Sequence, residues 1–227
     1  GSSFWLLDEP VDYDDYEANR FYMELVRRGY ESWGKKNIEL HYRTDVSQPE
    51  LTRGLWDGLC NLWDNSGLLG CASTAMFRMR RLPGENHWRY GGSPNISGKL
   101  IDFQQNFLTL WAIGANGALP YWNVLGGGDW FNPDDLSVYY SGKNYARSGK
   151  TYDGALPGLR LKAIRRAQQD IEYLNLLAAK KGWNYLKLRR ALAPYADDPS
   201  AWPLSFFRLD SKKLLELRRA VALELSR

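Results

Sequence analysis

The stretch Phe4-Trp5-Leu6-Leu7-Asp8-Glu9-Pro10 places four apolar residues directly before two carboxylates and a proline. A short, continuous apolar run that stops at polar residues is typical of a strand buried on both faces of a parallel sheet. Pro10 favours an extended backbone at the residue before it, so Glu9 is expected where this strand ends. The stretch therefore predicts a buried strand with an acidic pair at its carboxyl end.

Strand and helix patterns alternate along the chain that follows. Strands are predicted at residues 4–7, 38–42, 59–63, 87–90 and 118–124, and helices at residues 16–30, 49–56, 68–80 and 101–113. The acidic residues from Asp12 to Glu17 suit a helix N-terminus, and Gly34 suits the end of that helix. The alternation predicts an α/β fold with a parallel sheet.

The remainder of the chain predicts a long glycine-containing loop and then two strong helices. The helices are expected at residues 159–181 and 211–226, with a proline-rich connector between them. A complete (β/α)8 barrel typically needs about 250 residues and eight strands, whereas five strands are predicted here. Two alternatives follow from the pattern, a smaller open sheet or the C-terminal part of a barrel.

Composition and charge exclude several classes of function. The 227 residues are 44% hydrophobic and 25% charged, as in an ordinary globular protein. The net charge is only +4, and the basic residues of the last third alternate with acidic and apolar ones, so we expect no nucleic-acid partner. Two Cys and two His predict neither a disulfide framework nor a metal centre, and we expect no cofactor. No apolar run reaches the length of a membrane span and no signal peptide is visible, so we expect no membrane partner.

Aromatic residues are abundant and often lie next to hydrogen-bonding groups. The chain has 10 Trp and 14 Tyr, and the pairs Trp63-Asp64, Trp122-Asn123 and Asp129-Trp130 are examples of this neighbourhood. Sugars stack their apolar faces on rings while their hydroxyls need donors and acceptors, so the pairs suit a glycan site. The alternative is that these rings simply fill cores, as Trp and Tyr do in many proteins.

Several motifs in a fixed order resemble glycoside hydrolase family 123. They are Leu6-Leu7-Asp8-Glu9-Pro10, Trp88-Arg89-Tyr90-Gly91, Gly117-Ala118-Leu119-Pro120-Tyr121-Trp122, and Leu156-Pro157-Gly158-Leu159-Arg160-Leu161 with Arg165, Asp170 and Glu172-Tyr173-Leu174. The stretch from Leu209-Asp210 to Leu217-Arg218 resembles the terminal helix of that family. The resemblance implies that residues 1–182 form about strands 4–8 of a TIM-type (β/α)8 barrel, with residues 183–227 as a helical extension packed on it. The missing strands would then come from a companion chain or a second copy.

The resemblance also implies an activity. Family members are exo-acting β-N-acetylgalactosaminidases that retain configuration, with the 2-acetamido oxygen of the sugar as nucleophile. Asp8 would orient the acetamido group and Glu9 would serve as general acid and base. The enzymes are usually exported, so the chain is expected to be secreted, periplasmic or on the cell surface. An Asp-Glu-Pro sequence is also common as a plain strand-to-helix turn.

The expected substrate contacts come from predicted strand ends and from one loop, and core packing is the alternative for each aromatic. They are Tyr90, Trp122, Asn123, Trp63, Asp64 and Trp130. The alternative for the whole chain is a non-catalytic glycan-binding or assembly subunit formed by an incomplete barrel.

Overall fold

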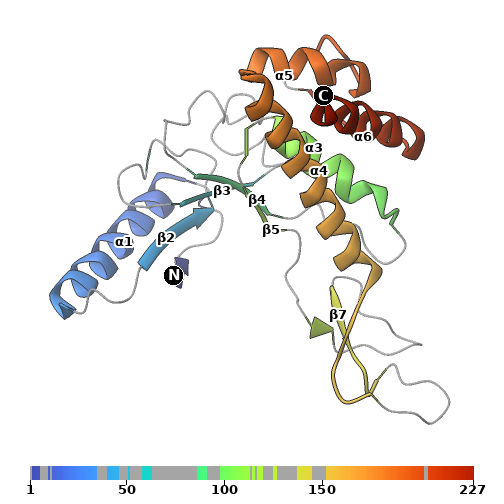
Figure 1. Cartoon of the computed structure of the whole chain (residues 1–227). Helices are drawn as coiled ribbons and strands as arrows, with labels where there is room; N and C mark the ends of the chain where they lie inside the picture. The colour runs from blue at the N-terminus through green and yellow to red at the C-terminus, as the bar shows by residue number, and fades with distance from the viewer. Residues whose placement is uncertain are drawn as a thin grey trace. The chain divides into compact units, whose positions relative to one another are not determined.

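The structure is a computed structural model of the whole chain (Figure 1). The residues it describes are 2–5, 10, 12–34, 40–45, 51, 58–62, 86–90, 98–112, 114–115, 117–119, 125–126, 137–144, 152–201 and 204–227. They belong to two compact units. The sheet unit comprises Gly1–Gly91 and Ile113–Leu119, and the helical unit comprises Gly92–Ala112 and Pro120–Arg227.

The sheet unit contains five parallel strands in the order β1-β2-β3-β4-β5. Their bounds are β1 Ser2–Trp5, β2 Leu40–Asp45, β3 Gly58–Leu62, β4 Asn86–Tyr90 and β5 Gly117–Leu119. Each overlaps a strand predicted from the sequence. Consecutive strands can be parallel because every connection is long enough to return the chain to the starting edge. Among the described residues β1 and β5 are the two edge strands. An open sheet and a barrel segment both contain this order, so the partial barrel stays a prediction.

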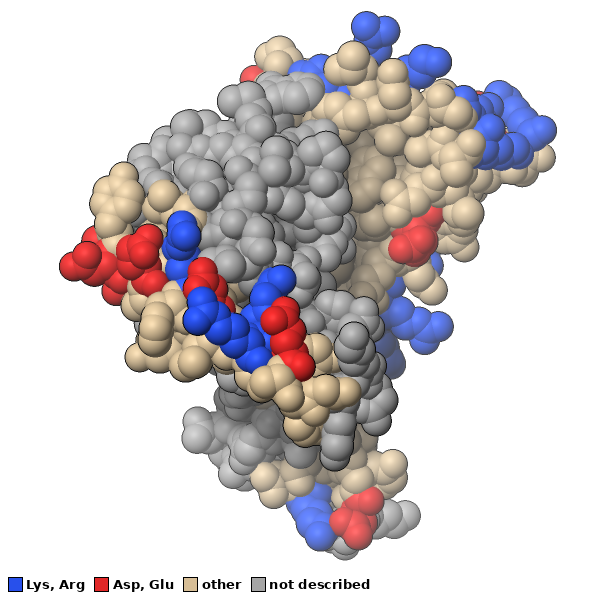
Figure 2. Space-filling view, turned by 90° about the vertical axis from the view of Figure 1, so that its left-hand side faces the viewer, with Lys and Arg blue, Asp and Glu red and all other residues tan. Residues whose placement is uncertain are grey.

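Helix α1, Tyr13–Trp33, follows the first strand and has both of its predicted end signals. The Asp12 side chain accepts a hydrogen bond from the backbone N–H of Asp15 at 3.0 Å, and Gly34 ends the helix with a left-handed φ of 68°. Tyr16 and Met23 are buried. Figure 2 shows acidic and basic side chains close to one another on the face that it presents. Phe21 and Leu25 of α1 are 63% and 55% exposed, so part of its apolar surface is not buried among the described residues.

The helical unit is built from four α-helices among the described residues (Figure 1). They are α3 Ile101–Ala112, α4 Leu159–Lys181, α5 Tyr185–Leu192 and α6 Ser211–Ser226, with a short 3-10 helix, η2, at Ala193–Tyr195. The predictions for α3, α4 and α6 are confirmed. Helix α5 lies where only a connector was expected. The sequence signals for α5 are local and few. The Asn184 side chain caps the helix by accepting a hydrogen bond from the Lys187 N–H at 3.1 Å, and the prolines of the connector come after the helix and do not interrupt it.

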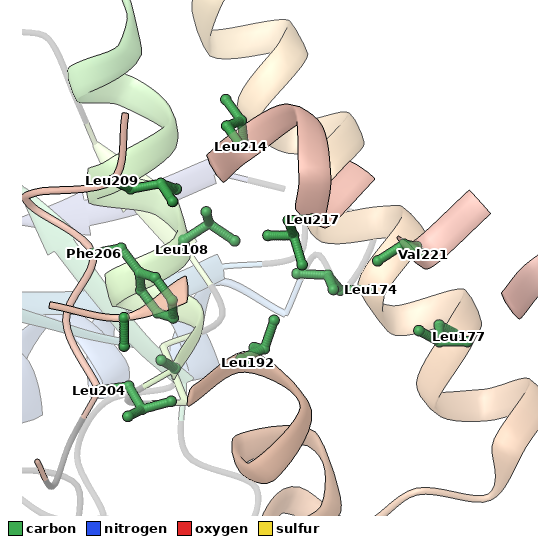
Figure 3. Close-up of a cluster of buried hydrophobic side chains, with 12 residues drawn as sticks. Leu108, Leu174, Leu177, Leu192, Leu204, Phe206, Leu209, Leu214, Leu217 and Val221 are labelled. Atoms are coloured by element: carbon green, nitrogen blue, oxygen red, sulfur yellow. The ribbon is translucent and has the colours of Figure 1, made fainter. Parts of the chain in front are cut away.

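A large apolar cluster connects α3, α4 and α6 of the helical unit (Figure 3), and a smaller one of Phe103, Ala163 and Ala167 joins α3 to α4. Leu174 and Leu177 of α4 lie beside Leu217 and Val221 of α6, and a second group from α3 and the segment before α6 completes the cluster. That second group includes Leu108, Leu204, Phe206 and Leu209. Each fully buried side chain of this size contributes about 1.5–3 kcal/mol relative to exposure. Residues on both sides of position 182 share this core, while the packing of 183–227 on a barrel stays a prediction.

A small three-stranded sheet replaces part of the predicted loop. Strands β6 Leu125–Gly126 and β7 Tyr139–Ser141 are parallel, and β7 pairs antiparallel with β8 Ala155–Pro157. The expectation of a loop throughout residues 139–141 is therefore wrong. Strands of two or three residues are too short to show an alternating pattern in the sequence. Of the helices within the described ranges, none combines the length and the hydropathy that a bilayer crossing requires.

Candidate functional site

The carboxyl ends of the five parallel strands share one edge of the sheet unit. The strands end at Trp5, Asp45, Leu62, Tyr90 and Leu119. In α/β proteins this edge is where ligands bind, because the loops that follow the strands converge there. In the sequence, most residues of the predicted glycan site lie at or directly after these strand ends. Trp130 comes later, between β6 and β7.

Most predicted site residues lie outside the described ranges. This holds for the catalytic pair Asp8 and Glu9, and for the contacts Trp63, Asp64, Trp122, Asn123 and Trp130. The helices predicted at 49–56 and 68–80 also lie outside them, apart from Leu51, which is in a 3-10 turn. Tyr90 is described through its backbone, as the last residue of β4, and it pairs with Leu62 of β3 and Leu119 of β5.

The strand register relates the end of β1 to the other strands. Trp5 pairs with Arg43, Arg43 with Gly58, and Gly58 with Asn86, which sets one level across four strands. Tyr90 ends β4 four residues after Asn86. In the sequence, the predicted catalytic residues Asp8 and Glu9 follow Trp5 by three and four residues.

In the helical unit, the motif around Gly158 fixes the start of α4 against the small sheet. The Gly158 N–H donates to the Val138 carbonyl at 2.8 Å, and a Cβ at position 158 would lie 3.0 Å from the Tyr140 ring and 3.1 Å from that carbonyl. Arg160, which is 6% exposed, donates to the Tyr140 hydroxyl, and its Cζ lies 5.7 Å from the centre of the ring. Without a side chain, Gly158 can lie close to the Tyr140 ring and the Val138 carbonyl. Arg160 connects α4 to β7 through its contacts with Tyr140.

A bidentate ion pair joins α4 to α6. Arg218 donates from Nε and Nη2 to the two carboxylate oxygens of Asp170, both at 2.7 Å. The Asp170 side chain is 7% exposed and that of Arg218 is 24% exposed. Two short, parallel, charge-assisted hydrogen bonds between largely buried side chains are among the strongest polar contacts that a protein makes. Sequence reasoning did not foresee this pair, because the two residues are 48 positions apart and nothing local connects them.

The ion pair borders a groove between α4 and α6 with a volume of about 500 Å³. Leu174, Leu217 and Val221 contribute apolar walls, and Arg166 and Tyr173 add polar groups. A cavity of this size with an apolar lining and a few polar groups has the character of a small-molecule site. It is the second candidate site, and it belongs wholly to the helical unit.

Two carboxylates of the helical unit have shifted acidities, and both shifts have local causes. Hydrogen bonds from the Ser200 hydroxyl and backbone N–H lower the pKa of Asp198. A hydrogen bond from Lys181, with an Nζ to Oε2 distance of 2.6 Å, lowers the pKa of Glu224. Both carboxylates are stabilised in the charged form and hold loops or helix ends, which is a structural role.

Asp197 connects the segment before α6 to the turn after η2. Its carboxylate accepts from the Ser205 hydroxyl and the Phe207 N–H at 2.9 Å each, and from the Arg208 N–H at 2.7 Å.

Throughout the part of the chain that the structure describes, no three His, Cys, Asp or Glu side chains gather closely enough to hold a metal ion.

No protein-family model matches the chain, and no curated protein matches its sequence.

Proposed function

We propose that this chain is the C-terminal part of a glycoside hydrolase barrel that removes terminal β-linked N-acetylhexosamine, most specifically N-acetylgalactosamine. The observation that supports the proposal is the order of the parallel strands β1-β2-β3-β4-β5, with the ends of β1 and β4 at Trp5 and Tyr90. In the sequence, Asp8 and Glu9 follow the end of β1 by three and four residues. The resemblance of the motifs to glycoside hydrolase family 123 supplies the chemistry for these two residues.

In this proposal the two neighbouring carboxylates divide the reaction between them. Asp8 accepts a hydrogen bond from the acetamido N–H of the sugar and stabilises the positive charge that develops as the acetamido oxygen attacks the anomeric carbon. Glu9 protonates the departing glycosidic oxygen, and then takes a proton from the water that opens the oxazolinium ring. Two displacements at one carbon give net retention of configuration.

The substrate contacts are proposed from the neighbouring strands. Tyr90 ends β4, and Trp63-Asp64 directly follow Leu62, which pairs with Tyr90. Trp122-Asn123 follow β5 by three residues in the sequence, and Trp130 comes after β6, in the connection to β7. Rings for stacking and side chains for hydrogen bonding are thus proposed at or after the ends of β3 and β4, which β2 separates from β1. For Trp122, Asn123 and Trp130 the support is the resemblance of the motifs alone.

The proposal includes a partner that completes the barrel. Within the described ranges, the outer edges of β1 and β5 pair with no further strand, and unpaired edges of a buried parallel sheet are unfavourable. We propose that a companion chain or a second copy supplies the missing strands.

We also propose export from the cytoplasm, as is usual for the family that the motifs resemble. The open edges equally favour the second candidate function, a non-catalytic subunit that binds glycan or assembles with another chain.

The test compares two chromogenic substrates that differ only at carbon 2 of the sugar. The purified full chain, alone and in every complex that it forms with a coexpressed candidate companion, is assayed with 4-nitrophenyl N-acetyl-β-galactosaminide and 4-nitrophenyl β-galactoside. We expect turnover of the acetamido sugar only. Equal turnover of both substrates would contradict substrate assistance. Glycan binding without turnover, in a complex shown to contain all barrel strands, would instead establish the non-catalytic subunit.

A further inference from the structure

Helix α1 has a second row of side chains on the side opposite its buried face. At about 100° per residue, the buried residues Tyr16, Asn19 and Met23 share one side of the helix. Phe21 and Leu25 lie on the opposite side, and they are 63% and 55% exposed. A helix that packs on its own sheet alone has polar residues on that side, so this outer face of α1 has the character of a contact surface.

The outer face has the spacing of a helix that packs lengthwise on another helix. Its residues recur at alternating intervals of four and three positions, which is the spacing of the a and d positions of a heptad. They are Ala18, Tyr22, Leu25, Gly29 and Ser32. The two large side chains lie at the centre, and Tyr22 is 49% exposed. The ends are small: a Cβ at Gly29 would meet nothing within 4 Å, and the Ser32 hydroxyl donates to the Gly29 carbonyl at 2.8 Å.

This face is complementary to itself when the second helix runs antiparallel. A two-fold axis between positions 23 and 24 brings Tyr22 opposite Leu25 of the second copy, and Ala18 opposite Gly29 of the second copy. The large side chains then fill the centre of the contact, and the small residues let the two helices approach closely at its ends. Opposed helix dipoles also favour the antiparallel over the parallel orientation.

An aromatic ring and a cation flank the outer face on the same side. The Phe21 ring stands edge-on to the Tyr22 ring, with centroids 5.4 Å apart and 75° between the planes. Arg28 is about two turns further along the helix, its side chain is 78% exposed, and Glu24 of its own helix accepts from it at 3.2 Å. The two-fold axis brings Arg28 of one copy within two residues, or about 3 Å along the axis, of the level of Phe21 of the other. The symmetry therefore gives two cation–π contacts, which are attractive even at exposed sites.

We propose that a second copy of this chain docks antiparallel on the outer face of α1, with Tyr22 and Leu25 at the centre and a contact between Phe21 and Arg28 on each side of the axis. The contact involves α1 alone and does not rest on the proposed hydrolase activity. The 21 residues of α1 span about 32 Å, so the interface is at the small end of specific interfaces, and we expect a dissociation constant on the order of 10 µM.

Sedimentation velocity of the full chain, at concentrations up to about 100 µM, tests the proposal. Leu25→Glu places a charge at the centre of the outer face. Leu186→Glu is its matched control, because Leu186 of α5 is also 55% exposed and lies outside α1. Arg28→Gln removes the flanking cation, and Arg20→Gln is its control on the same helix, away from the outer face. Circular dichroism verifies that each variant keeps its helices.

We expect a concentration-dependent equilibrium between monomer and dimer. Leu25→Glu should raise the dissociation constant at least about 100-fold, because two leucines leave the contact. Arg28→Gln should raise it about tenfold, because both cation–π contacts are lost, and both controls should dimerise as the wild type does. A wild type that stays monomeric at the highest concentration would overturn the proposal. So would a Leu25→Glu variant that dimerises as well as Leu186→Glu, or an Arg28→Gln variant that dimerises as well as Arg20→Gln.

Discussion

Replacing Arg218 by Met tests how α4 and α6 are joined. Methionine keeps most of the length and the apolar contacts of the arginine stem but removes both hydrogen bonds to Asp170. The Asp170 carboxylate, 7% exposed, would then remain without its cation. Breaking a fully buried pair in this way costs about 3–5 kcal/mol. Because 24% of the Arg218 side chain is exposed, water can partly replace it, and we expect a loss of about 2–3 kcal/mol.

Urea unfolding followed by helical circular dichroism measures this loss at pH 7. In thermal unfolding followed by the same signal, the expected fall in Tm is about 5–10 °C for a chain of this size. Arg219→Met is the control, since Arg219 is exposed on the same helix and carries the same charge. The double variant Asp170→Leu/Arg218→Met should recover much of the loss, because no buried charge is left unpaired. If Arg218→Met unfolds within 0.5 kcal/mol of the control, a threshold set by ordinary surface changes, the ion pair does not hold the two helices.

Three further predictions concern single contacts of the helical unit. Gly158→Ala should destabilise by about 1 kcal/mol in the same unfolding assay, because its Cβ would press on Tyr140 and the Val138 carbonyl; an unchanged midpoint would contradict that close approach. Asp197→Asn should lower the free energy of unfolding by about 1–3 kcal/mol. Both carboxylate oxygens of Asp197 accept from backbone N–H groups, and the amide NH2 of asparagine would leave one of these donors without an acceptor. Heteronuclear spectra should show changed amide shifts at 207 and 208. Lys181 lowers the pKa of Glu224 below its usual 4.5, so the pair stabilises the fold above that pH and loses its effect as the pH falls through the lowered pKa. The stability difference between the wild type and Lys181→Gln should therefore be present at pH 7 and become smaller as the pH falls below 4.5, and a difference independent of pH would refute the assignment.

Signals that lie close together in the sequence predicted individual helices and strands well. The cap at Asp12 and the glycine at Gly34 both lie within a few residues of the helix that they bound. The apolar run from Phe4 indicates β1, although the strand begins two residues earlier at Ser2. Such features depend on backbone preferences and on side chains that bond to their own neighbourhood, so they can be read without knowledge of tertiary contacts.

Contacts between distant segments could not be predicted in the same way. Asp170 and Arg218 each look like an ordinary charged residue on an amphipathic helix, and only the packing of α4 on α6 brings them together. The three-residue strands β7 and β8 owe their pairing to each other, not to any pattern within either segment. The candidate catalytic pair depends on the order of the motifs in the sequence, and its chemistry is therefore a proposal.

The most direct test of the proposed function is the effect of Glu9→Gln on hydrolysis of 4-nitrophenyl N-acetyl-β-galactosaminide by the assembled protein. Glutamine keeps the shape of the side chain but can neither donate the proton to the leaving oxygen nor accept one from water. Glu17→Gln, an exposed carboxylate in the first turns of α1, is the control. The account predicts that Glu9→Gln lowers kcat about 10²–10⁴-fold and that the control retains full activity. Equal kcat values for the wild type and Glu9→Gln would contradict it.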